Sequence, residues 1–118
     1  SGAFDKNVKR IRKVYREKYD FALNCINKYI KPDFIWGEGA LHIYIGIEGV
    51  KSRELLKECY KKNVIFTPGD IFSVDNSCEN TLRIGLTRLN LEQIEEGIRI
   101  IGEKVKELRE RIRFNEDK

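Results

Sequence analysis

The stretch Leu41-His42-Ile43-Tyr44-Ile45-Gly46-Ile47 places an aliphatic residue at every odd position and a polar, aromatic or glycine residue between them. Side chains of a β-strand alternate between its two faces, so this pattern predicts a strand with one buried face. The stretch Thr81-Leu82-Arg83-Ile84-Gly85-Leu86-Thr87 alternates in the same way. It predicts a second strand whose aliphatic face is opposite to Arg83.

The segment between these two strands is predicted to hold a short helix and further extended pieces. A turn at 48–51 precedes Ser52, a candidate N-cap, and the helix closes near Asn63. Its buried stripe comprises Leu55, Leu56, Cys59 and Tyr60. After the helix, 64–67 is predicted as a short strand, Pro68-Gly69 as a type II turn and 71–74 as another extended piece. Residues 75–80 are predicted as a polar loop.

Long amphipathic helices are predicted at both ends of the chain. The first runs from Asp5 to Ile30 and ends before Lys31-Pro32, and residues 31–39 then form a loop. The last begins at Leu91, where Asn90 and Gln93 form a variant of the capping box. Leu89 and Ile94 can form the hydrophobic staple around that cap. The helix that begins at Leu91 has an apolar stripe of Leu91, Ile94, Ile98, Ile101, Val105, Leu108 and Ile112.

The order of helices and strands predicts an α+β fold with a small, mostly antiparallel sheet covered by helices.

Length and composition indicate a single domain that folds in water. The chain has 118 residues, of which 41% are hydrophobic and 36% charged. This length suits one hydrophobic core. No apolar run approaches the roughly 20 residues that cross a bilayer, so a cytoplasmic location is expected and a membrane partner is not. Residues 1–3 are interpreted as a cloning remnant and 4–118 as one domain, made of a long helix at 4–30 and an α+β core at 40–114.

Charge is concentrated near the N-terminus. The chain has 23 Lys and Arg against 19 Asp and Glu, which gives a net charge of +4. Seven of the basic residues lie between Lys6 and Lys18. Such a cluster could contact nucleic-acid phosphates, but the sequence has no recognised groove-reading motif and no aromatic stacking platform beside it. A solvated helix face, or a docking surface for another domain, is the favoured interpretation.

Few residues are candidates for chemistry. The chain shows no complete hydrolytic triad, no Gly-rich phosphate loop and no Cys/His metal signature. Its single histidine, His42, is more typical of a structural residue than of a general base. Cys25 and Cys59 fall on apolar helical stripes and Cys78 in a polar loop, so reduced thiols are expected. Arg83 is the strongest candidate, because its planar guanidinium can bind a carboxylate.

Several segments, taken in order, resemble one family. They are 39–45, 55–59, 64–72, 82–86 and 94–98, preceded by the helical stretch 10–20. Together they resemble the C-terminal small domain of fold-type I aminotransferases, which depend on pyridoxal phosphate. The helix at 10–20 resembles the one that joins the large and small domains of that family. The resemblance covers nearly the whole chain.

The resemblance implies a function for individual residues. Arg83 would bind the α-carboxylate of an amino acid or 2-keto acid, and Pro68, Gly69 and Phe72 would lie near the active-site entrance. Residues 39–42 replace a commoner double glycine, which leaves the substrate preference open. Pyridoxal phosphate and its catalytic lysine would belong to a large domain of the parent protein. The parent is therefore expected to be a homodimeric transaminase, and this chain alone to bind no cofactor and to be inactive.

A second resemblance leads to a different function. Winged-helix transcriptional regulators of the MocR type carry an aminotransferase-like domain, and the basic helix and the strand at 41–47 also resemble theirs. In such a parent the domain would sense an effector, and nucleic acid would be a partner of the parent. Sequence upstream of this chain would separate the enzyme from the regulator.

Overall fold

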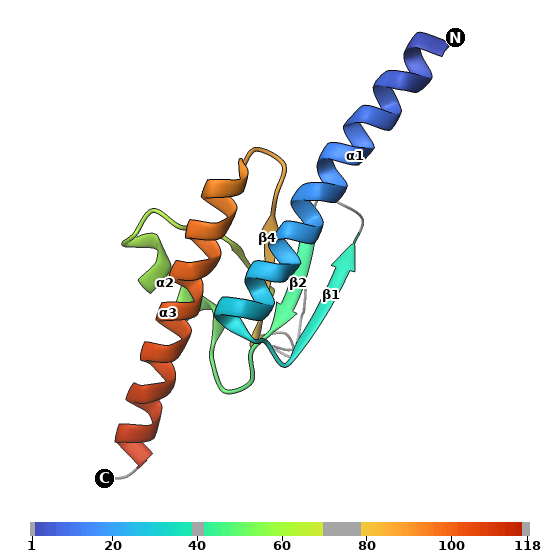
Figure 1. Cartoon of the computed structure of the whole chain (residues 1–118). Helices are drawn as coiled ribbons and strands as arrows, with labels where there is room; N and C mark the ends of the chain where they lie inside the picture. The colour runs from blue at the N-terminus through green and yellow to red at the C-terminus, as the bar shows by residue number, and fades with distance from the viewer. Residues whose placement is uncertain (1, 39–41, 70–78, 117–118) are drawn as a thin grey trace.

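The computed structural model describes residues 2–38, 42–69 and 79–116. The chain runs through the following elements in order: α1 (Gly2–Cys25), a π-helix η1 (Ile26–Ile30), β1 (Phe34–Glu38), β2 (His42–Gly46), α2 (Ser52–Tyr60), β3 (Thr67–Pro68), β4 (Thr81–Gly85) and α3 (Leu91–Glu116). The predicted α+β fold is confirmed, with long helices at both ends and a small sheet between them (Figure 1).

The sheet is antiparallel throughout its four strands. The strand order is β1-β2-β4-β3, and each neighbouring pair is antiparallel. The two predicted strands, β2 and β4, lie at its centre, and Ile43 pairs with Ile84 while Ile45 pairs with Leu82. The prediction of one buried aliphatic face for each of these strands is therefore confirmed.

The helices cover one face of this sheet and enclose the core. α1, η1 and α3 lie across the sheet, and α2 packs beside α3 (Figure 1). Each helix contributes buried side chains to the same cluster as the two central strands. The largest fully buried side chains are Ile26, Ile43, Ile45, Ile47, Leu55, Leu82, Leu86, Ile94 and Ile98. This apolar layer fixes the backbones of the strands, and thereby the positions of the residues on the face that points away from the helices.

The junction between η1 and α3 depends on a glycine. A Cβ atom on Gly102 would lie 2.3 Å from the backbone oxygen of Tyr29, which is inside the contact distance of any real Cβ atom. The Tyr29 hydroxyl also donates a hydrogen bond of 3.3 Å to Oε2 of Glu95, one α3 position that faces η1. The helices can therefore approach this closely only because residue 102 has no side chain.

The predicted end of the first long helix and the predicted start of the last one are confirmed. The π-helix stops at Lys31, which takes the left-handed conformation with φ of 52° and donates its N–H to the oxygen of Ile26. At the start of α3, Asn90 N–H donates to Oε1 of Gln93 at 2.9 Å, and Gln93 N–H donates to Oδ1 of Asn90 at 2.8 Å. This reciprocal pair is the capping box expected from the sequence.

The N-terminal segments differ from the prediction in two places. Helix α1 begins at Gly2 and not at Asp5, so Gly2 and Ala3 continue the helix. The loop predicted at 31–39 contains β1, because Phe34, Ile35 and Trp36 favour extended structure more than the flanking Pro32 and Gly37 oppose it.

The middle of the chain differs from the prediction as well. Ser52 is the first residue of α2 and not its cap, since Lys51 precedes the helix without a side-chain cap. Tyr60 is 66% exposed and does not join the buried stripe. The strand predicted at 64–67 is reduced to Thr67 and Pro68, and Pro68 pairs with Leu82 in place of a turn. The extended piece predicted at 71–74 and most of the loop at 75–80 lie outside the described residues.

Candidate functional site

Four side chains form a row across the face of the sheet that the described helices do not cover. Trp36 is paired with Tyr44, Tyr44 with Arg83 and Arg83 with Thr67. Directly paired residues of antiparallel strands share a face, and neighbours along a strand alternate. Because Ile45 faces the core, these four residues point to the other side. We call this side the outer face and the four residues the outer row.

The outer row begins with two aromatic rings. The centroids of Trp36 and Tyr44 are 5.5 Å apart, with an angle of 34° between the ring planes. Trp36 is 64% exposed and Tyr44 is half-buried. Phe34 lies on the same face, and its ring occupies the space where a Cβ atom of Gly46 would be, at 1.9 Å. The outer face therefore presents an aromatic surface.

Arg83 lies beside this aromatic surface. It is half-buried in β4, between the buried Leu82 and Ile84, so the core fixes the position of its backbone. Gly85 follows on the same face, where a Cβ atom would have Cδ2 of His42 as its nearest neighbour at 3.8 Å. The prediction that Arg83 points away from the aliphatic face is confirmed. A guanidinium in this position can bind a planar carboxylate through two parallel hydrogen bonds.

Two of the three residues predicted at an active-site entrance, Pro68 and Gly69, lie in the described part of the structure. Pro68 is buried and shares the covered face of the sheet with Leu82. Gly69 is also buried, and a Cβ atom there would lie 1.7 Å from Oγ1 of Thr81. Phe72 lies outside the described residues. The entrance function of these three residues stays a prediction.

The predicted structural cysteines are confirmed as free, buried thiols. Cys59 is fully buried, and desolvation raises the pKa of its thiol to about 12. Desolvation also raises the pKa of Cys25, with a further increase from the charge of Glu95. A thiol attacks as its thiolate, so neither residue is suited to nucleophilic chemistry near neutral pH. Cys78 lies outside the described residues.

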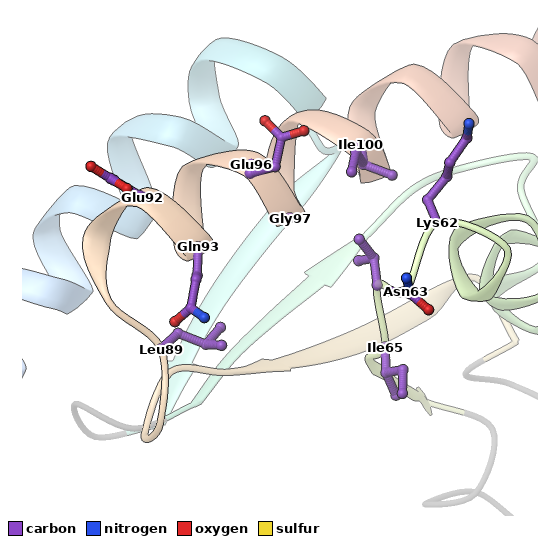
Figure 2. A pocket seen from close by; sticks show the side chains of 10 residues that line it. Lys62, Asn63, Ile65, Leu89, Glu92, Gln93, Glu96, Gly97 and Ile100 are labelled. Atoms are coloured by element: carbon purple, nitrogen blue, oxygen red, sulfur yellow. The ribbon is translucent and has the colours of Figure 1, made fainter.

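A hollow of about 390 Å³ lies on the helix side of the fold. Figure 2 shows Lys62 and Asn63 on the connection after α2, opposite Gln93 and Gly97 of α3. Glu96 at its rim is held by Arg99 through an ion pair of 2.6 Å, and the hydrogen bond from Arg99 lowers the pKa of Glu96. The hollow shares no lining residue with the outer row.

The described part of the chain shows neither a metal-binding cluster nor a membrane-spanning helix. It holds no group of three or more His, Cys, Asp or Glu residues that could bind a metal ion. None of its helices is long and apolar enough to cross a membrane. The basic part of α1 projects beyond the sheet (Figure 1), and Lys9, Arg10, Arg12, Lys13 and Arg16 are exposed on it.

Several known proteins with a related sequence are aminotransferases. An uncharacterized aminotransferase of Saccharolobus solfataricus and the 2-aminoadipate transaminase of Thermus thermophilus are each 30% identical to this chain over 108 residues. Both alignments cover 89% of this chain and 27% of the relative. The chain thus spans little more than a quarter of the length of these relatives. No protein-family model matches it.

The chain is homologous to the C-terminal small domain of fold-type I aminotransferases. Solved structures of this family share its fold. The α-aminoadipate aminotransferase LysN of Thermus thermophilus has a TM-score of 0.80 and 30% identity, covering 89% of this chain and 28% of the enzyme. The multiple substrate aminotransferase of Thermococcus profundus has a TM-score of 0.80 and 27% identity, covering 93% of this chain and 28% of the enzyme. LysN was crystallised with a phosphopyridoxyl-leucine adduct.

A regulator is also among the relatives of this aminotransferase-like chain. The HTH-type transcriptional regulator YdfD of Bacillus subtilis is 23% identical to it over 114 residues. The alignment covers 94% of this chain and 23% of the regulator. The sequence therefore has relatives in both classes of parent, with higher identity to the enzymes.

The described outer face has no lysine that could anchor pyridoxal phosphate. The cofactor is held in its enzymes through a Schiff base with a lysine. Ten strand positions with described backbones lie on the outer side by register, and none of them is a lysine: residues 34, 36, 38, 42, 44, 46, 67, 81, 83 and 85. The described residues thus offer the cofactor no covalent anchor beside Arg83.

The aromatic part of the site was missed by reasoning from the sequence. The sequence pattern predicts a loop for Phe34 and Trp36, and a loop gives them no position relative to Arg83. The sequence does contain an indication of this strand. Phe34, Ile35 and Trp36 are three consecutive residues of high β-propensity. Tyr44 was assigned to the correct strand, but its pairing with Arg83 depends on the register between β2 and β4.

Proposed function

We propose that this chain works as the C-terminal small domain of a pyridoxal-phosphate-dependent aminotransferase. In this function it contributes substrate binding and active-site closure to the transfer of an amino group between amino acids and 2-keto acids. The observation that carries the proposal is the position of Arg83 on the outer face, in a domain homologous to aminotransferases. The cofactor, when bound in the parent, supplies the electron sink for amino-group transfer.

Arg83 is the proposed anchor for the substrate α-carboxylate. Its guanidinium is permanently charged and its donors form a planar fork, which matches a carboxylate better than a lysine ammonium does. The neighbouring Leu82 and Ile84 are buried, so the strand cannot shift without disrupting the core. A rigid strand therefore sets the orientation of the bound acid, and the aromatic neighbours limit the access of water to the ion pair.

The other parts of the active site would come from a large domain. In this proposal the large domain holds the cofactor and its lysine, and it packs against the exposed basic part of α1. The parent is a cytoplasmic homodimer, and Pro68, Gly69 and Phe72 lie near the entrance to the active site. The chain alone is proposed to be inactive, because the described strands place no lysine on the outer face for the cofactor.

The proposal is tested in the full-length polypeptide that contains this chain. Arg83→Leu should lower kcat/KM for amino acid substrates by about 100-fold or more, since a charged hydrogen-bonding pair is lost. Cofactor absorbance should be unchanged. Arg88→Leu is the matched control, because Arg88 is an exposed arginine in the turn after β4. Equal turnover by the Arg83 and Arg88 variants would remove Arg83 from the substrate site.

The similarity to YdfD supports a second candidate function. In a MocR-type regulator the same domain would bind an effector through Arg83, without turnover. Transamination by the full-length polypeptide decides between the two functions. An enzyme turns over amino acids without DNA, whereas a regulator binds a specific DNA duplex and changes its affinity when an amino or keto acid is added.

A further inference from the structure

We infer that the outer row selects carboxylate ligands that carry an aromatic side chain, with Arg83 binding the carboxylate and Trp36 and Tyr44 contacting the ring. This inference deepens the proposed function and rests on its assignment of Arg83 as the carboxylate anchor. It adds a substrate class, and it assigns a specificity function to two residues of β1 and β2.

The register gives the ligand a direction. Tyr44 is the direct partner of Arg83 on one side, and Trp36 is the direct partner of Tyr44. Adjacent strands are ~4.8 Å apart, so these three residues follow one another at the spacing of a short extended ligand. An acid whose carboxylate meets the guanidinium therefore extends over Tyr44 toward Trp36. On the other side, Thr67 offers a small polar side chain and no aromatic surface.

The aromatic pair is already arranged to receive a third ring. Its centroid distance of 5.5 Å lies within the usual range for interacting aromatic side chains. Trp36 is 64% exposed, so most of the indole surface is accessible to a ligand. Ring quadrupoles favour offset or edge-to-face contacts between aromatic groups, which discriminates a phenyl ring from an alkyl chain of similar area.

The charge of the row disfavours the main alternative ligand class. Arg83 is the one cation among the four residues of the outer row. A dicarboxylate that used Arg83 for one acid group would place its second acid group against Tyr44 and Trp36. An aromatic surface repels an anion over its face and provides few donors to replace lost water. The row therefore favours a monocarboxylate with an apolar aromatic end.

The inference is tested by NMR titration of the 118-residue chain with three ligands: 3-phenylpropionate, propionate and 3-phenylpropionamide. Trp36 is the single tryptophan, so its indole N–H signal reports on the outer row without ambiguity. We expect 3-phenylpropionate to bind about tenfold more tightly than propionate and to shift both the indole signal and the Arg83 amide. The amide analogue should bind more weakly than the acid, because it lacks the charge that Arg83 recognises.

Two pairs of variants locate the effect. Trp36→Ala should remove the preference for the phenyl ligand, whereas Tyr60→Ala should not, since Tyr60 is an equally exposed aromatic residue on α2. Arg83→Leu should weaken binding of both acids, and Arg88→Leu should not. Circular dichroism spectra of all four variants check that the fold is retained.

The possible outcomes distinguish failure of the aromatic specificity from failure of the carboxylate anchor. If both acids bind with the same affinity and both depend on Arg83, the aromatic specificity is wrong and the carboxylate anchor stands. If 3-phenylpropionate binds equally well to the Arg83→Leu variant, the carboxylate anchor itself is wrong. If the Trp36 indole signal does not move at ligand concentrations up to about 20 mM, the aromatic contact is wrong.

Discussion

Tyr44 lies directly opposite Arg83 in the antiparallel pair formed by β2 and β4, on the outer face of the sheet. The two residues come from strands that are 39 positions apart in the sequence, and only the fold brings them together. Their backbones are held by Ile43, Ile45 and Leu82, which are fully buried on the other face. Recognition on the outer face and packing on the covered face are thus properties of the same two strands.

The exposed ring of Trp36 predicts a simple optical behaviour. In the isolated chain, tryptophan emission should lie at the long wavelength of a hydrated indole, and acrylamide should quench it efficiently, because 64% of the residue is exposed. Attachment of a large domain over the outer face should shift the emission to shorter wavelength and reduce quenching. Equal quenching in both proteins would show that the outer face stays uncovered.

Two glycines of α3 should respond to alanine in opposite directions. Gly102→Ala forces a Cβ atom against the backbone of Tyr29 and should lower the free energy of unfolding by about 1 to 3 kcal/mol. Gly97→Ala places its Cβ where no atom lies within 4 Å, so improved helix propensity should raise stability by up to ~1 kcal/mol. Urea denaturation of both variants measures the difference. Similar destabilisation by both would contradict the close contact between η1 and α3.

Alanine substitutions at Asn90 and Ser52, at the starts of α3 and α2, should also have different effects on stability. Asn90→Ala removes a cap whose side chain accepts from the N–H of Gln93, and it should cost about 1 kcal/mol. Within the described part of the structure the Ser52 hydroxyl is buried and has no hydrogen-bond partner. Ser52→Ala should therefore leave stability unchanged or raise it, since a buried unpaired hydroxyl is unfavourable. A loss of about 1 kcal/mol in the Ser52 variant would instead indicate a true N-cap.

The buried thiol of Cys59 should make stability depend on alkaline pH. Its pKa rises from 9.0 to about 12 on folding, so the native state keeps a proton that the unfolded chain releases. The stabilisation is complete below pH 9 and is lost progressively as the pH rises from 9 toward 12. The stability difference between wild type and Cys59→Ala should therefore shrink between about pH 8 and 10. A constant difference would show that the thiol is not shielded from water.

The sequence was sufficient for those parts of the fold that repeat a local pattern. β2 and β4 alternate over their whole length, and the capping box marks the start of α3 directly, so both could be located from the residues alone. β1 was not found because glycines and a proline surround a short apolar run. Strand β3 was placed too early, since its two-residue length depends on pairing with β4 and not on its own composition.

The candidate site could be predicted only in part for a similar reason. Alternation in β4 placed Arg83 opposite to the aliphatic face, and this prediction was confirmed. The aromatic neighbours of Arg83 depend on register across three strands, which no local pattern determines. The Ser52 prediction is wrong because Ser52 is the first residue of α2, after Lys51, and its buried hydroxyl makes no hydrogen bond within the described part of the structure.

The most direct test of the proposed function is a hybrid enzyme. The matching C-terminal part of the Thermus thermophilus 2-aminoadipate transaminase is replaced by this chain, which covers 27% of that relative. Circular dichroism and cofactor absorbance first establish that the hybrid is folded and loaded. We predict that the folded hybrid transaminates amino acids, and that Arg83→Leu lowers its kcat/KM by about 100-fold while Arg88→Leu does not. A folded, loaded hybrid whose activity is the same with Arg83 or leucine at this position would contradict the account.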